Sequence, residues 1–94
     1  PGDHQHILGV GNIKPNPVPA GITTTSMDYR LKAESTVTIT INDQLGNIVK
    51  TVADGTSAAG EHVVSLDLTG LTSGGYLVRV QAGTDVQTRR LIIQ

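Results

Sequence analysis

The sequence predicts an all-β fold, and three observations support that prediction. Thr, Val and Ile together supply 30 of the 94 residues, and these β-branched side chains fit pleated strands better than helices. Short apolar–polar alternations recur along the chain, and turn signals separate them about every eight to twelve residues. No window shows the period of about 3.6 residues that marks an amphipathic helix. We therefore expect an immunoglobulin-like antiparallel β-sandwich of about seven strands from Thr23 to Ile93, with a small barrel as the alternative.

The chain is expected to form one domain, because 94 residues cannot bury two independent cores. Residues 1–13 lack a clear hydrophobic period and are predicted to be a linker or tail. Residues 14–94 are predicted to be the sandwich domain, which starts with a stiff loop containing Pro15, Pro17 and Pro19. Because the sequence has neither an initiating Met nor an export leader, we expect it to be part of a longer protein.

Three strands are expected in the first half of the domain, over Thr23–Leu31, Thr36–Ile41 and Ile48–Val52. The middle strand has the clearest signal, because its apolar side chains alternate with Thr as in a sheet with one solvated face. A hairpin turn is predicted to join the last two strands. In that turn Asp43 can accept hydrogen bonds from nearby backbone N–H groups, and Gly46 can adopt a positive φ.

Three more strands are expected in the second half, over His62–Leu68, Tyr76–Gln81 and Val86–Ile93. Loops containing Gly are predicted to precede the first two of them, over Asp54–Gly60 and Thr69–Gly75. The apolar parity changes inside the last strand, which predicts a bulge near Thr88.

The apolar faces of these strands predict the core. Tyr76 is expected to place its ring there and to donate its hydroxyl to a backbone acceptor, as in a tyrosine corner. The predicted core is Met27, Tyr29, Leu31, Val37, Ile39, Ile41, Val49, Val52, Val64, Leu66, Leu68, Leu71, Tyr76, Val78, Val80, Leu91 and Ile93.

The composition argues against several classes of function. Seven Lys and Arg against eight Asp and Glu give a formal net charge of −1, whereas nucleic-acid binding by phosphate neutralisation needs a clustered positive excess. The absence of Cys excludes disulfides, thiolate metal sites and Cys nucleophiles. With two Tyr and no Phe or Trp, the chain offers no platform for stacking bases or sugars. No apolar run reaches the ~20 residues of a transmembrane helix.

No metal or cofactor site is predicted. His4 and His6 with Asp3 could bind a metal, but no third ligand is fixed nearby, and a linker or tag is favoured. Asp43 and Asp54 could suggest calcium, which needs several oxygen ligands at close spacing. Asp43 has no acidic neighbour, so a turn is favoured there.

No catalytic residue is predicted, and we expect neither an enzyme nor a small-molecule substrate. His62 lies on the apolar parity of its strand, where a buried His bonded to the backbone is favoured over a ligand. A triad could be drawn from Ser65 or Ser73 with His62 and Asp67. No Gly-x-Ser-x-Gly turn supports such a triad, and Ser65 and Asp67 do not share a strand face with His62.

The sequence also places Arg89 and Arg90 in the last predicted strand, with Arg79 in the strand before it. One interpretation is that these charges protect a sheet edge from unwanted pairing. The other is that they bind carboxylates on a partner, because guanidinium groups bind carboxylates in a bidentate way. Since neighbouring residues of a strand face opposite ways, at least one of Arg89 and Arg90 should be exposed.

Several short motifs, in their order and spacing, resemble one family. They are Pro15-Asn16-Pro17, Val37-x-Ile39-x-Ile41-x-Asp43-x-x-Gly46-x-x-Val49, Ala59-Gly60-x-His62, Leu71-x-x-Gly74-x-Tyr76 and Thr88-Arg89-Arg90-Leu91-Ile92-Ile93. From Pro15 to Gln94 the chain is similar to the type A C-terminal sorting domain of cargo proteins of the type IX, or Por, secretion system. The structural turn markers carried over by this resemblance are Asn16, Pro17, Asp43, Gly46, Gly60, Gly74 and Tyr76. The chain departs from the family pattern at Lys14, Asn42, Leu66 and Gly75.

The resemblance implies a non-catalytic signal that sends an upstream cargo domain across the outer membrane of a Gram-negative cell. It implies transit through the periplasm, recognition by an outer-membrane translocon, removal by a sortase-like peptidase, and a final location at the cell surface or outside the cell. It also implies that recognition uses the last segment, which is Arg89, Arg90, Leu91, Ile92, Ile93 and Gln94. We expect a monomer without cofactors. The alternatives are a fibronectin-like or immunoglobulin-like spacer or adhesion module of a secreted protein, and an assembly domain like that of flagellar hook-capping proteins.

Overall fold

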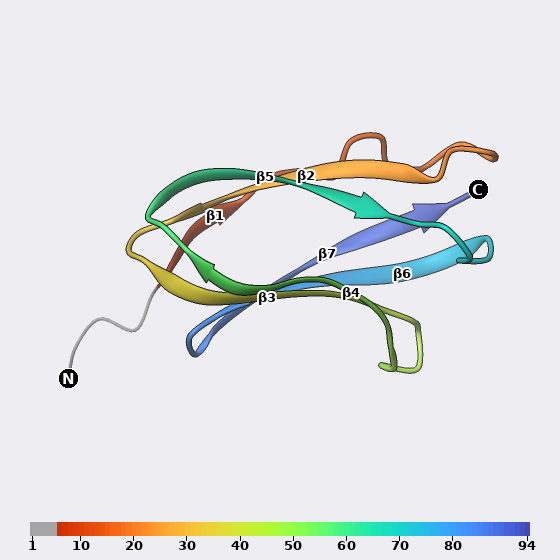
Figure 1. Cartoon of the computed structure of the whole chain (residues 1–94). Coiled ribbons are helices and arrows are strands. Elements are labelled where there is room, and N and C mark those ends of the chain that lie inside the picture. Colours follow the sequence, from red (N-terminus) through yellow and green to blue (C-terminus); the bar gives the residue numbers. More distant parts are fainter. Residues whose placement is uncertain (1–5) are drawn as a thin grey trace.

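The computed structural model describes residues 6–94, and these residues fold as strands joined by short connections, except for the longer segment 11–23 between the first two strands (Figure 1). The strands are β1 (Ile7–Val10), β2 (Thr24–Leu31), β3 (Ser35–Asn42), β4 (Ile48–Ser57), β5 (Gly60–Asp67), β6 (Gly74–Ala82) and β7 (Asp85–Ile93). Within this described part of the chain there is no helix long and apolar enough to cross a bilayer.

The strands form two antiparallel sheets that pack face to face. One sheet has the order β1-β2-β5 and the other β4-β3-β6-β7. Figure 1 shows the two layers, with the three-stranded sheet above the four-stranded sheet. The predicted all-β sandwich is therefore confirmed, and this strand order is compatible with an immunoglobulin-like topology.

The core lies between the sheets and agrees with most of the predicted set. Its buried members from that set are Met27, Tyr29, Leu31, Val37, Ile39, Ile41, Leu66, Leu68, Tyr76, Val78, Val80, Leu91 and Ile93, with Val52, Val64 and Leu71 partly buried against them. Val49 was predicted to be in the core, and this is wrong, because Val49 is 39% exposed. The buried apolar residues that the prediction missed are Ile7, Val10, Ile13, Val18 and Ala82.

The exposure of Val49 follows from the pairing of β4 with β3. The register shifts twice, so that Ile39 pairs with Ala53 while Thr40 pairs with Thr51. Each shift places an extra residue in β4, and at the second shift, where Ile41 pairs with Lys50 and Asn42 pairs with Ile48, that residue is Val49. β4 also continues to Ser57, through residues predicted to be a loop. That part of β4 is polar, and Thr38 Oγ1 of β3 donates to Asp54 Oδ1 at 3.3 Å.

The bulge predicted near Thr88 is wrong. β6 and β7 pair without a register shift from Gly74 opposite Ile93 to Ala82 opposite Asp85. The inward parity of β7 carries half-buried Gln87 and Arg89 before the buried Leu91 and Ile93. The same face of β7 is polar in its first half and apolar in its second half, and this change of polarity was misread as a change in which residues face inward.

β1 lies inside the segment that was predicted to be a linker or tail. It pairs with β2, and both Ile7 and Val10 are buried. Ile7 and Val10 are three residues apart, and a register shift between Ile7 and Gly9 lets both of them face the core. The metal hypothesis for Asp3 and His4 lies outside the described residues.

Candidate recognition surface on the last strand

β7 is an edge strand, and the start of the domain covers part of its free edge. The Asn16 side chain bonds to the β7 backbone twice, donating from Nδ2 to Arg90 O at 2.8 Å and accepting from Ile92 N at Oδ1 at 3.1 Å. Val18 continues this contact as a parallel bridge to Ile93, since Val18 N donates to Ile92 O and Gln94 N donates to Val18 O. Asn16, predicted as a turn marker, thus occupies the edge of the strand in place of a neighbouring strand.

Arg89 faces the inside of the sandwich and ties β7 to β1. Its Nη2 donates to Val10 O of β1 at 2.8 Å, and its Nη1 donates to Thr88 O at 2.8 Å. Both bonds satisfy backbone carbonyls, so the guanidinium is occupied by the protein's own main chain. These contacts give Arg89 a positioning role between the two sheets.

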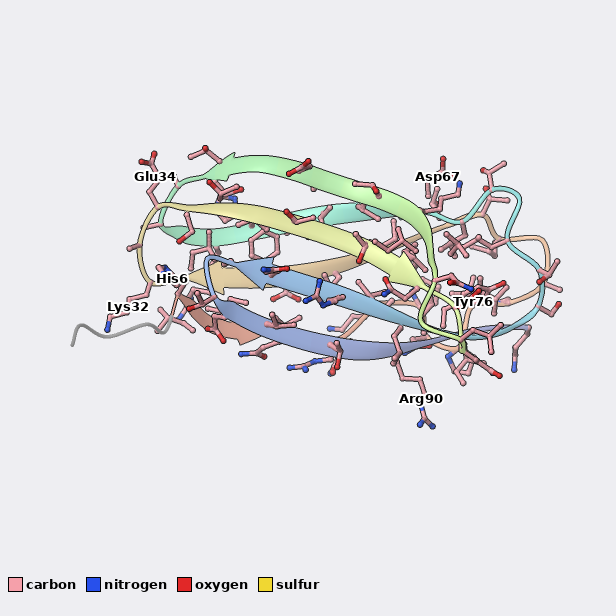
Figure 2. The ribbon with its side chains drawn as sticks, turned by 90° about the horizontal axis from the view of Figure 1, so that it is seen from below. His6, Lys32, Glu34, Asp67, Tyr76 and Arg90 are labelled. Carbon is pink, nitrogen blue, oxygen red and sulfur yellow. The ribbon has the colours of Figure 1, made fainter. Side chains whose placement is uncertain are left out.

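Arg90 faces the opposite way. Its residue is exposed, and Figure 2 shows the side chain pointing away from the sandwich. Among the described residues its guanidinium has no hydrogen-bond or ion-pair partner. The expectation that at least one of the two arginines is exposed is confirmed, and the exposed one is Arg90.

Arg90 borders a groove on the outer face of the four-stranded sheet. The groove has a volume of about 480 Å³ and is lined by Gln44, Gly75, Tyr76, Leu77, Arg90 and Ile92. Leu77 pairs with Arg90 and Gly75 pairs with Ile92 across the β6–β7 ladder, so these four residues are neighbours on one face. Leu77 is 43% exposed, which leaves apolar surface beside the free guanidinium.

Other predicted turn markers lie in turns and at the starts of strands in both sheets. Asp43 Oδ1 accepts from Leu45 N and Asn47 N at 2.9 Å each, and Gly46 has a φ of 91°. Gly60 and Gly74 also have positive φ, at the start of β5 and β6. The Tyr76 hydroxyl donates to Thr72 O at 2.7 Å, which confirms the predicted backbone acceptor.

His62 has a structural environment. It is half-buried, its Nε2 lies 2.7 Å from Ala58 O, and its ring stacks on Tyr29 with the centroids 5.1 Å apart. Ser65 and Asp67 are exposed on the other parity of β5, so the strand does not bring them to His62. Within residues 6–94 no group of three or more His, Asp or Glu side chains could hold a metal ion.

Asp67, at the end of β5, has a pKa that is lowered by its surroundings. The Thr69 backbone N–H and hydroxyl, which both bond to Asp67 Oδ1, lower the pKa of this carboxyl. The Nζ atom of Lys50 in β4 lies 3.7 Å from Asp67 Oδ2, and its positive charge lowers the pKa of Asp67 further.

The fold and this surface first define a class: a small β-sandwich module whose last strand, fixed by the start of the domain, presents a free guanidinium beside an apolar groove. The chain belongs to the Secretion system C-terminal sorting domain family, which it matches over residues 12–94. The resemblance found from the motifs is thereby confirmed. Comparisons with curated proteins and with solved structures gave no match.

Family membership gives the domain its role. It is a C-terminal sorting signal for type IX secretion, and it marks the protein that carries it for the cell surface or for release. This role implies contact with the type IX secretion machinery and fusion to an upstream cargo. A sorting-signal family also indicates a non-enzymatic role.

Proposed function

We propose that the outer-membrane translocon of the type IX system recognises this domain in the periplasm through β7, and that a sortase-like peptidase then separates it from its cargo. The sorting-domain family supports the use of the secretion machinery. The single observation that supports β7 as the contact is the exposed Arg90 guanidinium, which has no partner among the described residues.

The last segment divides into two groups by the direction of its side chains. Leu91 and Ile93 are buried, and Arg89 is bonded to the backbone of β1 and β7. Arg90 and Gln94 are exposed, and Ile92 is half-buried on the outer face. We therefore assign recognition to Arg90, Ile92 and Gln94, and the placement of the strand to Arg89, Leu91 and Ile93.

The proposed removal by a peptidase concerns the other end of the domain. The division between a linker at residues 1–13 and a domain at residues 14–94 remains a prediction. Ile7 is fully buried in the core and β1 pairs with β2. Cleavage that leaves the sandwich intact therefore has to occur before Ile7, and we propose that the junction with the cargo lies there.

A reporter protein fused upstream of residues 1–94, in a bacterium with a type IX system, tests the role of β7. Arg90→Ala should leave the reporter in the periplasm while the melting temperature of the purified domain holds, because exposed charge changes usually cost under ~0.5 kcal/mol. Arg30→Ala is the matched control, since Arg30 is exposed on the other sheet, where it pairs with Glu61. Export of Arg90→Ala at the wild-type level would refute recognition through this residue.

A further inference from the structure

The groove beside Arg90 combines one free positive charge with apolar walls. Leu77 and Ile92 contribute aliphatic surface, and Arg90 is the one charged residue among those that line it. Asp43, next to the lining residue Gln44, uses its Oδ1 for the N–H groups of its own turn. The groove therefore presents an unneutralised guanidinium at the edge of an apolar surface, which suits a ligand with a carboxylate next to an aliphatic group.

Gly75 keeps this groove open. A Cβ at Gly75 would lie 3.1 Å from Gln44 Nε2, so Gln44 would have to move by a few tenths of an ångström, and a longer side chain would occupy the space above the ladder. The backbone at Gly75 does not require glycine, because Gly75 is not among the glycines that adopt a positive φ. The lack of a side chain at Gly75 therefore leaves space in the groove and does not serve the backbone conformation.

We propose that this groove binds an extended partner segment in which an Asp or Glu lies next to an aliphatic residue. Arg90 binds the carboxylate, and the aliphatic side chain lies over Gly75 between Leu77 and Ile92. The volume of about 480 Å³ suits one or two side chains rather than a folded element. This proposal rests on the proposed recognition through β7 and specifies the chemistry of the partner. The charge of the groove and its apolar lining together favour this occupant over a second copy of the chain, which would bring a second Arg90 to the same face.

Titration of the isotope-labelled 94-residue chain with short synthetic peptides tests the proposal. Acetyl-Leu-Glu-Leu-amide is the probe, and acetyl-Leu-Gln-Leu-amide is its neutral match. The Glu peptide should shift the amide resonances of Gly75, Leu77 and Ile92, and the Gln peptide should bind about two- to fivefold more weakly, as for an exposed ion pair. This difference should shrink as salt is added.

Two glycine variants separate the groove from the fold. Gly75→Val should abolish the shifts, whereas Gly55→Val should retain them, because Gly55 lies in β4 and a Cβ there meets no atom within 4 Å. Arg90→Lys should keep binding but lose part of the preference for Glu, since an ammonium group does not form a bidentate pair. If Gly75→Val unfolds the chain, Arg90→Ala, which should remove the preference for Glu over Gln, takes its place.

Several results would overturn the proposal. Equal affinity for the two peptides would remove the role of the carboxylate, and shifts that persist in Gly75→Val would place binding elsewhere. Concentration-dependent shifts of Leu77 and Ile92 without peptide would show that a second copy occupies the groove. Loss of export in Arg90→Ala without any preference for the Glu peptide would overturn this proposal and leave the proposed function standing. A clear preference for the Glu peptide, together with unchanged export of Arg90→Ala, would support the groove as a binding site and overturn its use in export.

Discussion

The sandwich has two lateral sides, where an edge strand of one sheet faces an edge strand of the other, and these two sides are connected in different ways. On one side β4 and β5 face each other, and the chain passes directly between them through Ala58 and Ala59. On the other side β1 faces β7, which lies at the far end of the sequence. The first side is held by the covalent chain, and the second needs contacts between segments more than seventy residues apart.

The side without a covalent link has the more extensive hydrogen bonding. Ile7 N donates to Asp85 Oδ2 at 3.0 Å, and Arg89 bonds to Val10 O. Asn16 and Val18 add four more bonds along the free edge of β7. The β4–β5 side has an ion pair between half-buried Lys50 and exposed Asp67 at 3.7 Å, and a solvent-accessible pair of this kind contributes little in water. Residues 7–18 therefore help to position β7, although they lie far from it in sequence.

Truncation of a buried residue of β7 should destabilise the domain most, and an exposed residue of β4 provides the comparison. Leu91→Ala should lower the free energy of unfolding by ~2–5 kcal/mol, because Leu91 is fully buried and its truncation leaves a cavity. Val49→Ala should cost less than ~1 kcal/mol, because Val49 is 39% exposed. Denaturant titration of both variants measures the difference. Equal losses would show that the two edge strands depend on the core to the same degree.

The sequence predicted the strands that obey a simple local rule. In β2, β3 and β6 the apolar residues alternate, so the strand face and most of the core followed from the period alone. β4 escaped that rule because its register shifts depend on how it pairs with β3, and pairing is not visible in the β4 sequence. β1 was missed because four residues with a register shift carry no period.

The candidate site could be predicted only in part for a related reason. Parity alone indicated that Arg89 and Arg90 face opposite ways, and the motifs indicated the segment. Which arginine is free depends on Val10, whose carbonyl accepts from Arg89 across 79 positions of sequence. The role of Asn16 likewise depends on backbone atoms 74 and 76 residues away. No local pattern carries such contacts, so these roles emerged only from the fold.

A smaller effect is expected when the cover on the β7 edge is removed. Asn16→Ala deletes two hydrogen bonds and should lower the free energy of unfolding by about 1–2 kcal/mol, since net bonds contribute about 0.5–1.5 kcal/mol each. Amide exchange of Ile92 should become faster, because its N–H loses the Asn16 oxygen. Asn16→Asp keeps that acceptor and should protect Ile92 while losing the bond to Arg90 O.

The control for this prediction is Asn12→Ala, because Asn12 is exposed and its side chain makes no hydrogen bond to any of residues 6–94. It should change neither the stability nor the exchange of Ile92 by a measurable amount. Unchanged exchange of Ile92 in Asn16→Ala would mean that the Val18 bridge alone holds the edge.

The smallest effect concerns Asp67 on the β4–β5 side, and it depends on pH. Thr69 and Lys50 hold the folded-state pKa of Asp67 below its ordinary value of 3.8. A carboxyl whose pKa is lowered by folding binds protons more readily in the unfolded chain. Its contribution to stability is therefore present above pH 3.8 and is lost as the pH falls through the lower, folded-state pKa.

Asp67→Asn keeps an oxygen for the Thr69 N–H but removes the charge. Wild type should therefore be slightly more stable than the variant at neutral pH, and this difference should shrink below pH 3.8. Melting temperatures of the two proteins across the acid range measure that difference, while Lys50→Ala reports the part due to the ion pair. Because Asp67 is exposed, the ion pair should matter less than the bonds to Thr69, and Lys50→Ala should reproduce only a small part of the pH dependence. A difference that is independent of pH would mean that the Asp67 charge does not contribute to the stability of the fold.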